Sequence, residues 1–462
     1  MKISKFLLAA ICGFMALSLL TISCNKDDED SDSRKEVAVY SAEAALKWNK
    51  LLLQIERYAA GYRPGPAPRA LGYLGFACYE ACISGMPSYN SIEHTYPGLD
   101  LPVAQAGKAY HWPTVVHAVY SSMMPKFFPN PPATEASNMA LLISQLNAEY
   151  QSEAGQEIFD RSLAFGTSVA EVVWNWSTTD AFGHEAYQDP FAGYDWAQNF
   201  DSDGDWKPTV PGPPQPMFPH WGKVRTFVID QDEKLALPPL PYNESPTSEM
   251  YSQAIEVYSQ NTPTLSYENE WIGEFWSDDL LNLTFSPGPR WIAITNQVIE
   301  DKNADLEIAI EAYAKVGMAL NDAAVGCWHS KYFYNVERPA TYLQRVVDPN
   351  WKPALENPIN GDEGFTPPFP AYPSGHSTMG AAAAEVLGDV FGYAYEMTDR
   401  CHEDRTEFEG RPRTFGSFYE MALENAWSRV PLGVHWRMDC TEGMRMGTAI
   451  GRKVHQRLSW KK

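Results

Sequence analysis

The sequence has few basic residues for its length, and this deficit excludes one common class of binding partner. It contains 36 Lys and Arg against 58 Asp and Glu in 462 residues, which gives a formal net charge of -22. Because nucleic acids are bound through basic patches, such an excess of negative charge argues against a nucleic-acid partner. Beyond that, an acidic surface indicates only that the protein is soluble.

Cysteines are also scarce. The sequence has seven, and two of them, Cys12 and Cys24, stand near the N-terminus. The five that follow are an odd set that cannot pair completely within one chain, and their spacing is not that of a zinc site. A disulfide between Cys401 and Cys440 is one arrangement open to a protein outside the cytoplasm.

Long apolar runs are missing beyond the N-terminal segment, so we expect no later part of the chain to span a bilayer. The N-terminus itself is typical of a targeting segment, because Lys2 and Lys5 precede an apolar run over residues 6–20. Ser23 and Cys24, followed by an acidic stretch, resemble the cleavage site and export signal of a bacterial surface lipoprotein.

From this pattern we expect three parts in the chain. Residues 1–23 form a lipoprotein signal peptide with Cys24 as the lipid-bearing residue, residues 24–38 an acidic tether, and residues 39–462 a single helical domain. The expected location is the outer membrane or the cell surface, with a periplasm-facing placement also open, and membrane contact is through the lipid alone. A plain signal peptide with an incidental cysteine is the alternative, and the sequence leaves an oligomer open.

The rest of the chain has the composition of a folded helical protein. Apolar residues make up 44% and aromatic residues 13% of the sequence, which is enough for a large core. Helical spacing of apolar residues predominates and alternating strand patterns are scarce, so we predict an all-α fold of helical bundles. The expected helices cover about 41–53, 70–83, 133–150, 155–176, 248–259, 291–300, 306–328, 379–395, 417–428 and 436–458.

A stretch rich in Pro, Gly and aromatic residues interrupts this pattern at 189–241. We expect it to be a long ordered loop packed over the helices. Within it, Asp201, Asp203 and Asp205 have the spacing of a calcium loop, but the glycine expected after the third acidic position is missing. An ordinary acidic turn is therefore the favoured interpretation.

Three segments in the last third of the chain contain residues suited to binding an anion. In the first, Lys331 and Arg338 are seven residues apart, which is two helical turns. We therefore expect both cations on one face of one helix that Pro339 ends. Taken alone, the pair equally fits two solvated surface charges.

The second segment is Pro373-Ser374-Gly375-His376, and it is expected to begin a helix because Ser374 is a suitable N-cap and four alanines follow at 381–384. A helix start offers backbone N–H groups and a positive dipole end, and Gly375 lets an anion approach closely. His376 would exchange protons beside it near neutral pH. A surface cap with an ordinary histidine is the alternative for this segment alone.

The third segment runs from Ser428-Arg429 through His435 to Asp439. His435 and Asp439 are four residues apart in the expected last helix, so the carboxylate can accept a hydrogen bond from Nδ1 of the imidazole. Nε2 then remains available as a ligand or nucleophile. A structural His–Asp pair is the alternative reading of this segment by itself.

Together, the ordered patterns Lys-x6-Arg-Pro, Pro-Ser-Gly-His and Ser-Arg-x5-His-x3-Asp resemble the signature of one superfamily. It contains the type 2 phosphatidic-acid phosphatases and the vanadium haloperoxidases. The resemblance implies a helical-bundle fold in which all three segments line one pocket. It implies His435 as the vanadium ligand or nucleophile, His376 as the acid–base and Asp439 as the support of His435. The residues that it implies for binding the oxygens of vanadate or phosphate are Lys331, Arg338, Ser374, Gly375 and Arg429.

One such pocket serves two chemistries, because five-coordinate vanadate has the shape of a phosphoryl group midway through in-line transfer. A haloperoxidase would hold vanadate, a site that phosphate can also occupy, and oxidise iodide or bromide with hydrogen peroxide. A phosphatase would hydrolyse a small phosphoester through a phosphohistidine at His435. A non-catalytic surface binding lipoprotein is a third reading, and the complete set of acid–base, nucleophile and cations argues against it.

The rest of the chain favours the haloperoxidase. Four stretches resemble secreted bacterial vanadium haloperoxidases, at 69–73, 219–222, 275–278 and 369–373. Trp328 and Phe369 occupy positions where such relatives place aromatic residues beside the halide, although ordinary core packing explains them equally well. Phosphatases of the superfamily are either membrane proteins with several spanning helices or much shorter chains.

Overall fold

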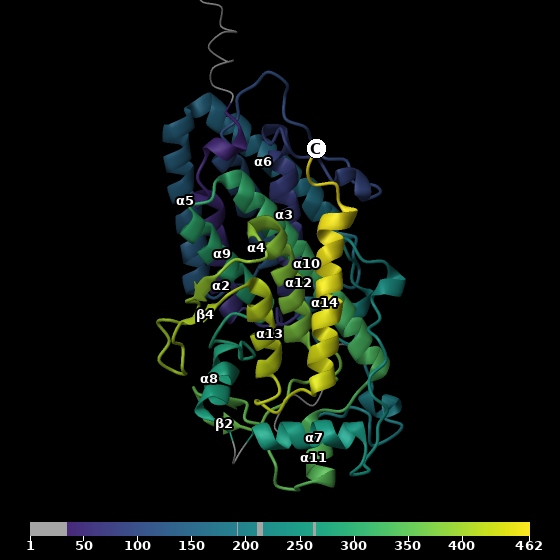
Figure 1. The fold of residues 1–462 in the computed structure, drawn as a ribbon. Helices are drawn as coiled ribbons and strands as arrows, with labels where there is room; N and C mark the ends of the chain where they lie inside the picture. Colours follow the sequence, from purple (N-terminus) through teal and green to yellow (C-terminus); the bar gives the residue numbers. More distant parts are fainter. Residues whose placement is uncertain (1–34, 192, 210–215, 262–264) are drawn as a thin grey trace, which may run out of the picture.

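The computed structural model describes residues 35–191, 193–209, 216–261 and 265–462. The expected signal peptide, Cys24 and the tether up to residue 34 lie outside the described residues. Val37 is already fully buried, so the folded part begins within the expected tether. Figure 1 shows stacked α-helices with two small antiparallel hairpins, β1–β2 and β3–β4, which confirms the all-α prediction.

The helices follow one another along the chain as α2 (Glu43–Tyr58), α3 (Pro66–Cys82), α4 (Trp112–Phe127), α5 (Ala133–Ala154), α6 (Gln156–Thr178), α7 (Glu249–Gln260), α8 (Tyr267–Phe275), α9 (Arg290–Lys302), α10 (Leu306–Tyr334), α11 (Pro339–Val346), α12 (Gly375–Phe391), α13 (Phe418–Ser428) and α14 (Arg437–Arg457). The strands are β1 (Glu356–Asn357), β2 (Asp362–Glu363), β3 (Met397–Asp399) and β4 (Arg413–Phe415). Ten of the helices match the expected set, while α4, α8 and α11 were not expected.

Helix α10 forms the centre of the molecule and is buried along most of its length. It packs against α3 on one side and α12 on the other. A Cβ added at Gly75 of α3 would lie 2.7 Å from the carbonyl oxygen of Tyr313 on α10. The two helices therefore approach at backbone distance, which only a residue without a side chain permits.

Helices α12 and α14 lie side by side in the same way (Figure 1). Gly443, Gly447 and Gly451 recur every four residues along α14 and face α12, because residues four apart share one side of a helix. At Gly443 an added Cβ would lie 2.7 Å from Cβ of Ser377. This close packing brings the first turn of α12 next to the first turn of α14.

The described part of the 189–241 stretch is a loop with short 3-10 turns, as expected, and Trp206 and Trp221 pack its chain onto the helices. Its acidic residues form a turn in which the Asp205 carboxylate accepts hydrogen bonds from the N–H groups of Asp201 and Ser202. The turn interpretation of these residues therefore holds in the structure.

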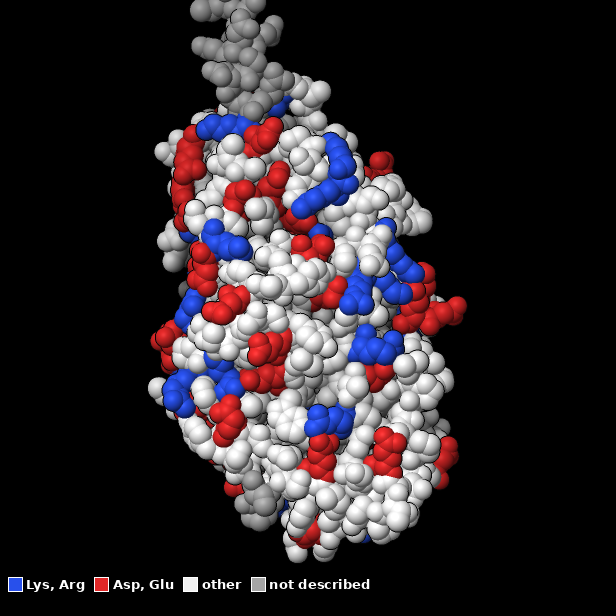
Figure 2. Space-filling view, viewed as in Figure 1, with Lys and Arg blue, Asp and Glu red and all other residues white. Residues whose placement is uncertain are grey.

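The disulfide considered between Cys401 and Cys440 is not formed, since both are free thiols. Cys401 follows β3 and contacts Gln297 of α9, whereas Cys440 is buried in the first turns of α14. Among the described residues, no helix combines the length and apolarity that a bilayer span needs. The face in Figure 2 carries acidic and basic side chains interspersed among uncharged ones.

Candidate active site

The three sequence segments meet at one cavity of about 400 Å³. Its wall includes Gly375, His376, Arg429 and His435, which come from the start of α12, the end of α13 and the turn before α14. Lys331, Arg338, Ser374 and Asp439 are fully buried beside this wall. Arg338 and Asp439 contact His435, Lys331 lies against the ring of Phe369, and Ser374 directly precedes Gly375. The structure therefore brings together every residue expected to surround the anion.

Lys331 and Arg338 reach the site differently from the prediction of a single helix. Helix α10 ends at Tyr334 because Asn335 takes a left-handed conformation (φ 50°), and Arg338 is extended as the residue before α11. The expectation that both cations share a helix face is therefore wrong. The cause is local, since a residue that precedes a proline, as Arg338 precedes Pro339, favours extended backbone.

The two cations nevertheless converge, because the same backbone segment holds both. The ammonium group of Lys331 donates to the carbonyl oxygens of Pro370 and Ala371, each at 2.8 Å. Nε and Nη2 of Arg338 donate to the carbonyl oxygen of Phe369 at 3.1 and 3.0 Å. Nη1 of Arg338 also donates to the carbonyl oxygen of Val434 at 2.7 Å and to His435. One N–H group of Lys331 and one of Arg338 are therefore left for an anion.

His435 stands between a cation and a carboxylate. Its Nδ1 lies 2.8 Å from Oδ2 of Asp439, and its Nε2 lies 3.0 Å from Nη1 of Arg338. The expected contact between His435 and Asp439 is thus confirmed, although α14 begins only at Arg437 and His435 precedes it. Because a carboxylate accepts and a guanidinium donates, Nδ1 carries the proton and the lone pair of Nε2 accepts the hydrogen bond from Arg338.

The pocket holds a surplus of buried positive charge. Burial first, and repulsion by Arg338 next among the cations, lowers the pKa of Lys331 to about 7. Burial and Arg429 likewise lower the pKa of Arg338 to about 9. The pKa of His435 falls well below its usual value through burial and the same cations, which keeps the imidazole neutral. A bound anion would relieve this repulsion.

Arg429 has buried N–H groups that no protein group accepts from in the described part of the chain. Its Nη2 donates to Oδ2 of Asp279 at 2.7 Å, while its Nε and Nη1 are buried without a hydrogen-bond partner among the described residues. Buried guanidinium N–H groups are rarely left unpaired in folded proteins. The donors of Arg429, Lys331 and Arg338 therefore fit the oxygens of a vanadate or phosphate ion.

The start of α12 adds backbone donors to the site. Ser374 is the N-cap, as predicted, and its hydroxyl oxygen accepts from the N–H of Ser377 at 3.3 Å. Its own N–H donates to the carbonyl oxygen of Asp439 at 3.0 Å, which ties α12 to α14. Gly375 is the first helical residue, where the backbone N–H has no partner within the helix and suits an anion.

His376 lies in the first turn of α12 and points to the segment after α8. Its Nε2 is 2.8 Å from the carbonyl oxygen of Ser277, and since a carbonyl only accepts, Nε2 carries the proton and Nδ1 is the basic nitrogen. Burial first, and Arg429 next, lower the pKa of His376 to about 4. The side chain is therefore a neutral base at neutral pH.

Trp328 and Phe369 form an aromatic wall on the cation side of the cavity. Their ring centroids are 4.9 Å apart, and the ammonium nitrogen of Lys331 lies 5.6 and 5.1 Å from them. Trp328 is buried and Phe369 half-buried. The two residues are thus in contact with each other and close to the ammonium group of Lys331.

Two residues that touch the site were not expected from the sequence. Asp279 pairs with Arg429, and the carbonyl of Ser277 accepts from His376. Both belong to the short stretch after α8, where residues 275–278 already resembled those of haloperoxidases. That resemblance was the available signal, but spacing alone does not connect a segment to side chains 99 and 150 residues away.

The chain is similar to several known vanadium haloperoxidases. The model of the second helical-bundle domain of vanadium chloroperoxidase matches residues 311–460. The chain is 26% identical to the vanadium chloroperoxidase of Curvularia inaequalis over 87% of this chain and 79% of that protein. It is 33% identical to the vanadium-dependent bromoperoxidase of Ascophyllum nodosum over 26% of this chain and 24% of that one. The crystal structure of the first bacterial vanadium-dependent iodoperoxidase superposes with a TM-score of 0.79 at 27% identity, covering 93% of this chain and 99% of that one.

Proposed function

The chain belongs to the vanadium haloperoxidase superfamily, and on that premise we propose that it is a vanadate-dependent enzyme that oxidises iodide or bromide with hydrogen peroxide. The observation that carries the proposal is the surplus of buried cations around Nε2 of His435. Arg429 in particular has two buried N–H positions that lack a protein partner. Such a pocket is built for an oxyanion that is held beside an imidazole lone pair.

In this proposal the protein binds vanadate through two kinds of contact. Lys331, Arg338 and Arg429 donate to its oxygens, together with the helix start at Ser374 and Gly375. His435 ligates the metal through Nε2, because Asp439 fixes the proton on Nδ1. Phosphate is a tetrahedral oxyanion like vanadate, so it competes for these donors.

Bound vanadate would supply a Lewis-acid centre that activates hydrogen peroxide without a redox change of the protein. The overall reaction converts hydrogen peroxide, a halide ion and a proton into hypohalous acid and water. His376 would take a proton from hydrogen peroxide at Nδ1, since its Nε2 proton is donated to Ser277. The same imidazole then returns that proton as water leaves.

The preference for iodide or bromide rests on the aromatic wall. A halide has one charge and no directional bonds, so the polarity of its surroundings selects it. Trp328 and Phe369 place polarisable rings beside the cations, which suits a large halide that gives up its water easily. The similarity to a bacterial iodoperoxidase structure over 93% of the chain supports the same choice.

The decisive experiment uses metal-free protein with and without orthovanadate. Halide oxidation with hydrogen peroxide and hydrolysis of a phosphate monoester are measured on the same preparation, with chloride, bromide and iodide compared by kcat/KM. We expect orthovanadate to switch on halide oxidation and to inhibit any ester hydrolysis. Strong ester hydrolysis with no halide oxidation would instead establish the phosphatase that works through a phosphohistidine at His435.

Two variants sharpen this comparison. His435→Ala is expected to lose both orthovanadate retention and turnover. His455→Ala removes a half-buried imidazole near the far end of α14 and is expected to keep both. Full turnover in His435→Ala would contradict the proposal that His435 is the vanadium ligand.

We also propose that the enzyme is a lipoprotein anchored through Cys24 at the outer membrane or cell surface. The support is the sequence of the first 29 residues. Cells that express the full chain would be labelled with a radioactive fatty acid, and the Cys24→Ser variant would be the matched control. Label in the variant equal to that in the parent protein would contradict the assignment.

A further inference from the structure

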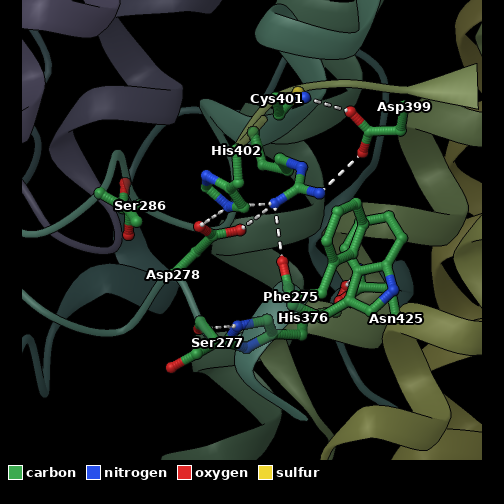
Figure 3. Close-up of polar contacts among 12 residues, drawn as sticks. Phe275, Ser277, Asp278, Ser286, His376, Asp399, Cys401, His402 and Asn425 are labelled. Carbon is green, nitrogen blue, oxygen red and sulfur yellow. Dashed lines mark hydrogen bonds and ion pairs between the residues drawn. The ribbon is translucent and has the colours of Figure 1, made fainter. Parts of the chain in front are cut away.

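The segment Ser277-Asp278-Asp279 connects the active site to a second buried cluster of charges. On the site side, the Ser277 carbonyl oxygen accepts from Nε2 of His376 at 2.8 Å, and Asp279 accepts from Arg429 at 2.7 Å. Asp278 between them adopts a left-handed conformation with φ 42°. Its carboxylate points away from His376 and into the other cluster (Figure 3).

The centre of that cluster is Arg290, the first residue of α9. Nη1 of Arg290 lies 3.0 Å from Oδ2 of Asp278, and Nη2 lies 2.7 Å from Oδ2 of Asp399 on β3. Nε2 of His402 lies 3.1 Å from the other oxygen of Asp278. All four side chains are at most 3% exposed. The cluster therefore joins the loop after α8 to α9 and to the β3 hairpin (Figure 3).

Aromatic rings seal this cluster from water. The guanidinium of Arg290 lies 4.6 Å from the ring of Phe275 and 4.5 Å from the ring of Trp276, and Nη1 donates to the Phe275 carbonyl oxygen at 2.9 Å. Nη1 of Arg63 donates to the backbone carbonyl oxygen of Asp278 at 3.4 Å. The turn at Asp278 is thus clamped through both its side chain and its backbone.

Burying a cation with two carboxylates is a poor way to gain stability, because the desolvation of the charges offsets their attraction. What such a cluster does provide is one defined geometry, since any displacement leaves a charge buried without its partner. Here the geometry that is fixed is the turn at Asp278. Left-handed backbone is unfavourable for a non-glycine residue and persists only where its surroundings hold it.

We propose that Arg290 and Asp278 are positioning residues of the active site. Their ion pair fixes the backbone turn at Asp278. That turn positions the Ser277 carbonyl, which holds His376, and the Asp279 carboxylate, which holds Arg429. The part that concerns His376 rests on the proposed function, because it needs halide oxidation to be seen. The part that concerns Arg429 applies to any oxyanion that enters the pocket.

The test measures anion affinity in Asp278→Asn, prepared as the metal-free full chain. Orthovanadate and, separately, inorganic phosphate are titrated by calorimetry, and the melting temperature is recorded. We expect both dissociation constants to rise by about 10-fold or more, as is usual when a residue that orients a ligand-binding group is changed. Affinities equal to those of the parent protein would overturn the proposal.

Asp180→Asn is the matched control. It breaks a buried Arg–Asp pair of the same kind, in which Nε of Arg69 lies 3.1 Å from Oδ2 of Asp180 and both side chains are 4% exposed. This pair contacts none of the residues around the anion pocket. We expect a lower melting temperature with unchanged anion affinity. A loss of affinity equal to that of Asp278→Asn would reduce the Arg290 cluster to a structural role.

Arg290→Lys is a second variant that tests the proposal if Asp278→Asn does not fold. A lysine retains the charge but not the fork that grips two carboxylates, so we expect an intermediate affinity, between the parent protein and Arg290→Gln. With saturating orthovanadate, kcat of Arg290→Lys for halide oxidation should fall below that of the parent protein, while its KM for halide is unchanged. A parent protein that binds orthovanadate without oxidising halide would contradict the proposed function, yet the comparison of affinities would still decide the positioning role.

Discussion

Nη1 of Arg338 lies 3.0 Å from Nε2 of His435, so the imidazole nitrogen that faces the anion pocket receives a hydrogen bond from a cation. That bond exists only if Nε2 has a lone pair, which agrees with the proton on Nδ1 being donated to Asp439. The same lone pair is what a metal ligand or a nucleophile needs, so the hydrogen bond from Arg338 has to open before His435 can act as either. The contacts of the protein itself therefore select the tautomer that either chemistry requires.

Replacing Asp439 should weaken anion binding without removing a ligand. Asp439→Asn keeps the shape but removes the charge that holds the Nδ1 proton of His435. We expect the dissociation constant for orthovanadate to rise by about 10- to 100-fold, the usual effect of changing the partner of a ligating histidine. Titration calorimetry on the metal-free protein measures it. An unchanged constant would mean that the tautomer of His435 does not depend on Asp439.

His376→Ala should separate binding from turnover. His376 contacts Ser277 rather than the cations that hold the oxyanion, so orthovanadate affinity should stay close to that of the parent protein. Loss of a general acid–base is expected to slow turnover by about 10² to 10⁴-fold. Steady-state halide oxidation at saturating orthovanadate provides the measurement. Unchanged turnover would exclude the acid–base role.

Gly443→Ala should disturb the site through helix packing alone. The new Cβ would lie 2.7 Å from Cβ of Ser377 and 2.9 Å from the Ser374 carbonyl oxygen, so α14 must move away from the start of α12. We expect the free energy of unfolding to fall by about 1–3 kcal/mol, as for other overpacked sites, together with weaker orthovanadate binding. Thr441→Ala, at an exposed position two residues earlier on α14, is the control in chemical denaturation. Equal stability of the two variants would contradict the packing argument.

Features of the site that depend on neighbouring residues could be predicted from the sequence. Ser374 was expected to cap a helix because capping chemistry is local, and it does. The contact between His435 and Asp439 followed from their spacing, even though the helix starts two residues after His435. The shared helix of Lys331 and Arg338 was wrong, because the left-handed Asn335 ends α10 before Arg338.

What the sequence could not give are the contacts between distant segments. Helix α4 was missed because it is buried on nearly every side and has no polar face to reveal its period. Asp279 and Arg290 act on residues that lie about 110–150 positions further along the chain. Periodicity and spacing carry no information on such pairs, so these partners appeared only once the chain was folded.

Lys331 should couple anion binding to proton uptake. Its pKa falls from 10.5 to about 7 because the side chain is fully buried beside Arg338. Between these two values the ammonium group has lost its proton in the folded protein, and a bound oxyanion favours its return. Affinity for orthovanadate should therefore be highest below about pH 7 and fall as the pH rises through that window.

Calorimetry at about pH 8.5 in two buffers with different ionisation enthalpies measures the protons taken up on binding. We expect up to about one proton more in the parent protein than in Lys331→Met, which has no ammonium group to recharge. Ionisation of orthovanadate itself is common to both proteins and cancels in the difference. Equal proton uptake by the two would show that Lys331 keeps its charge while buried, and that the carbonyl oxygens of Pro370 and Ala371 suffice to hold it.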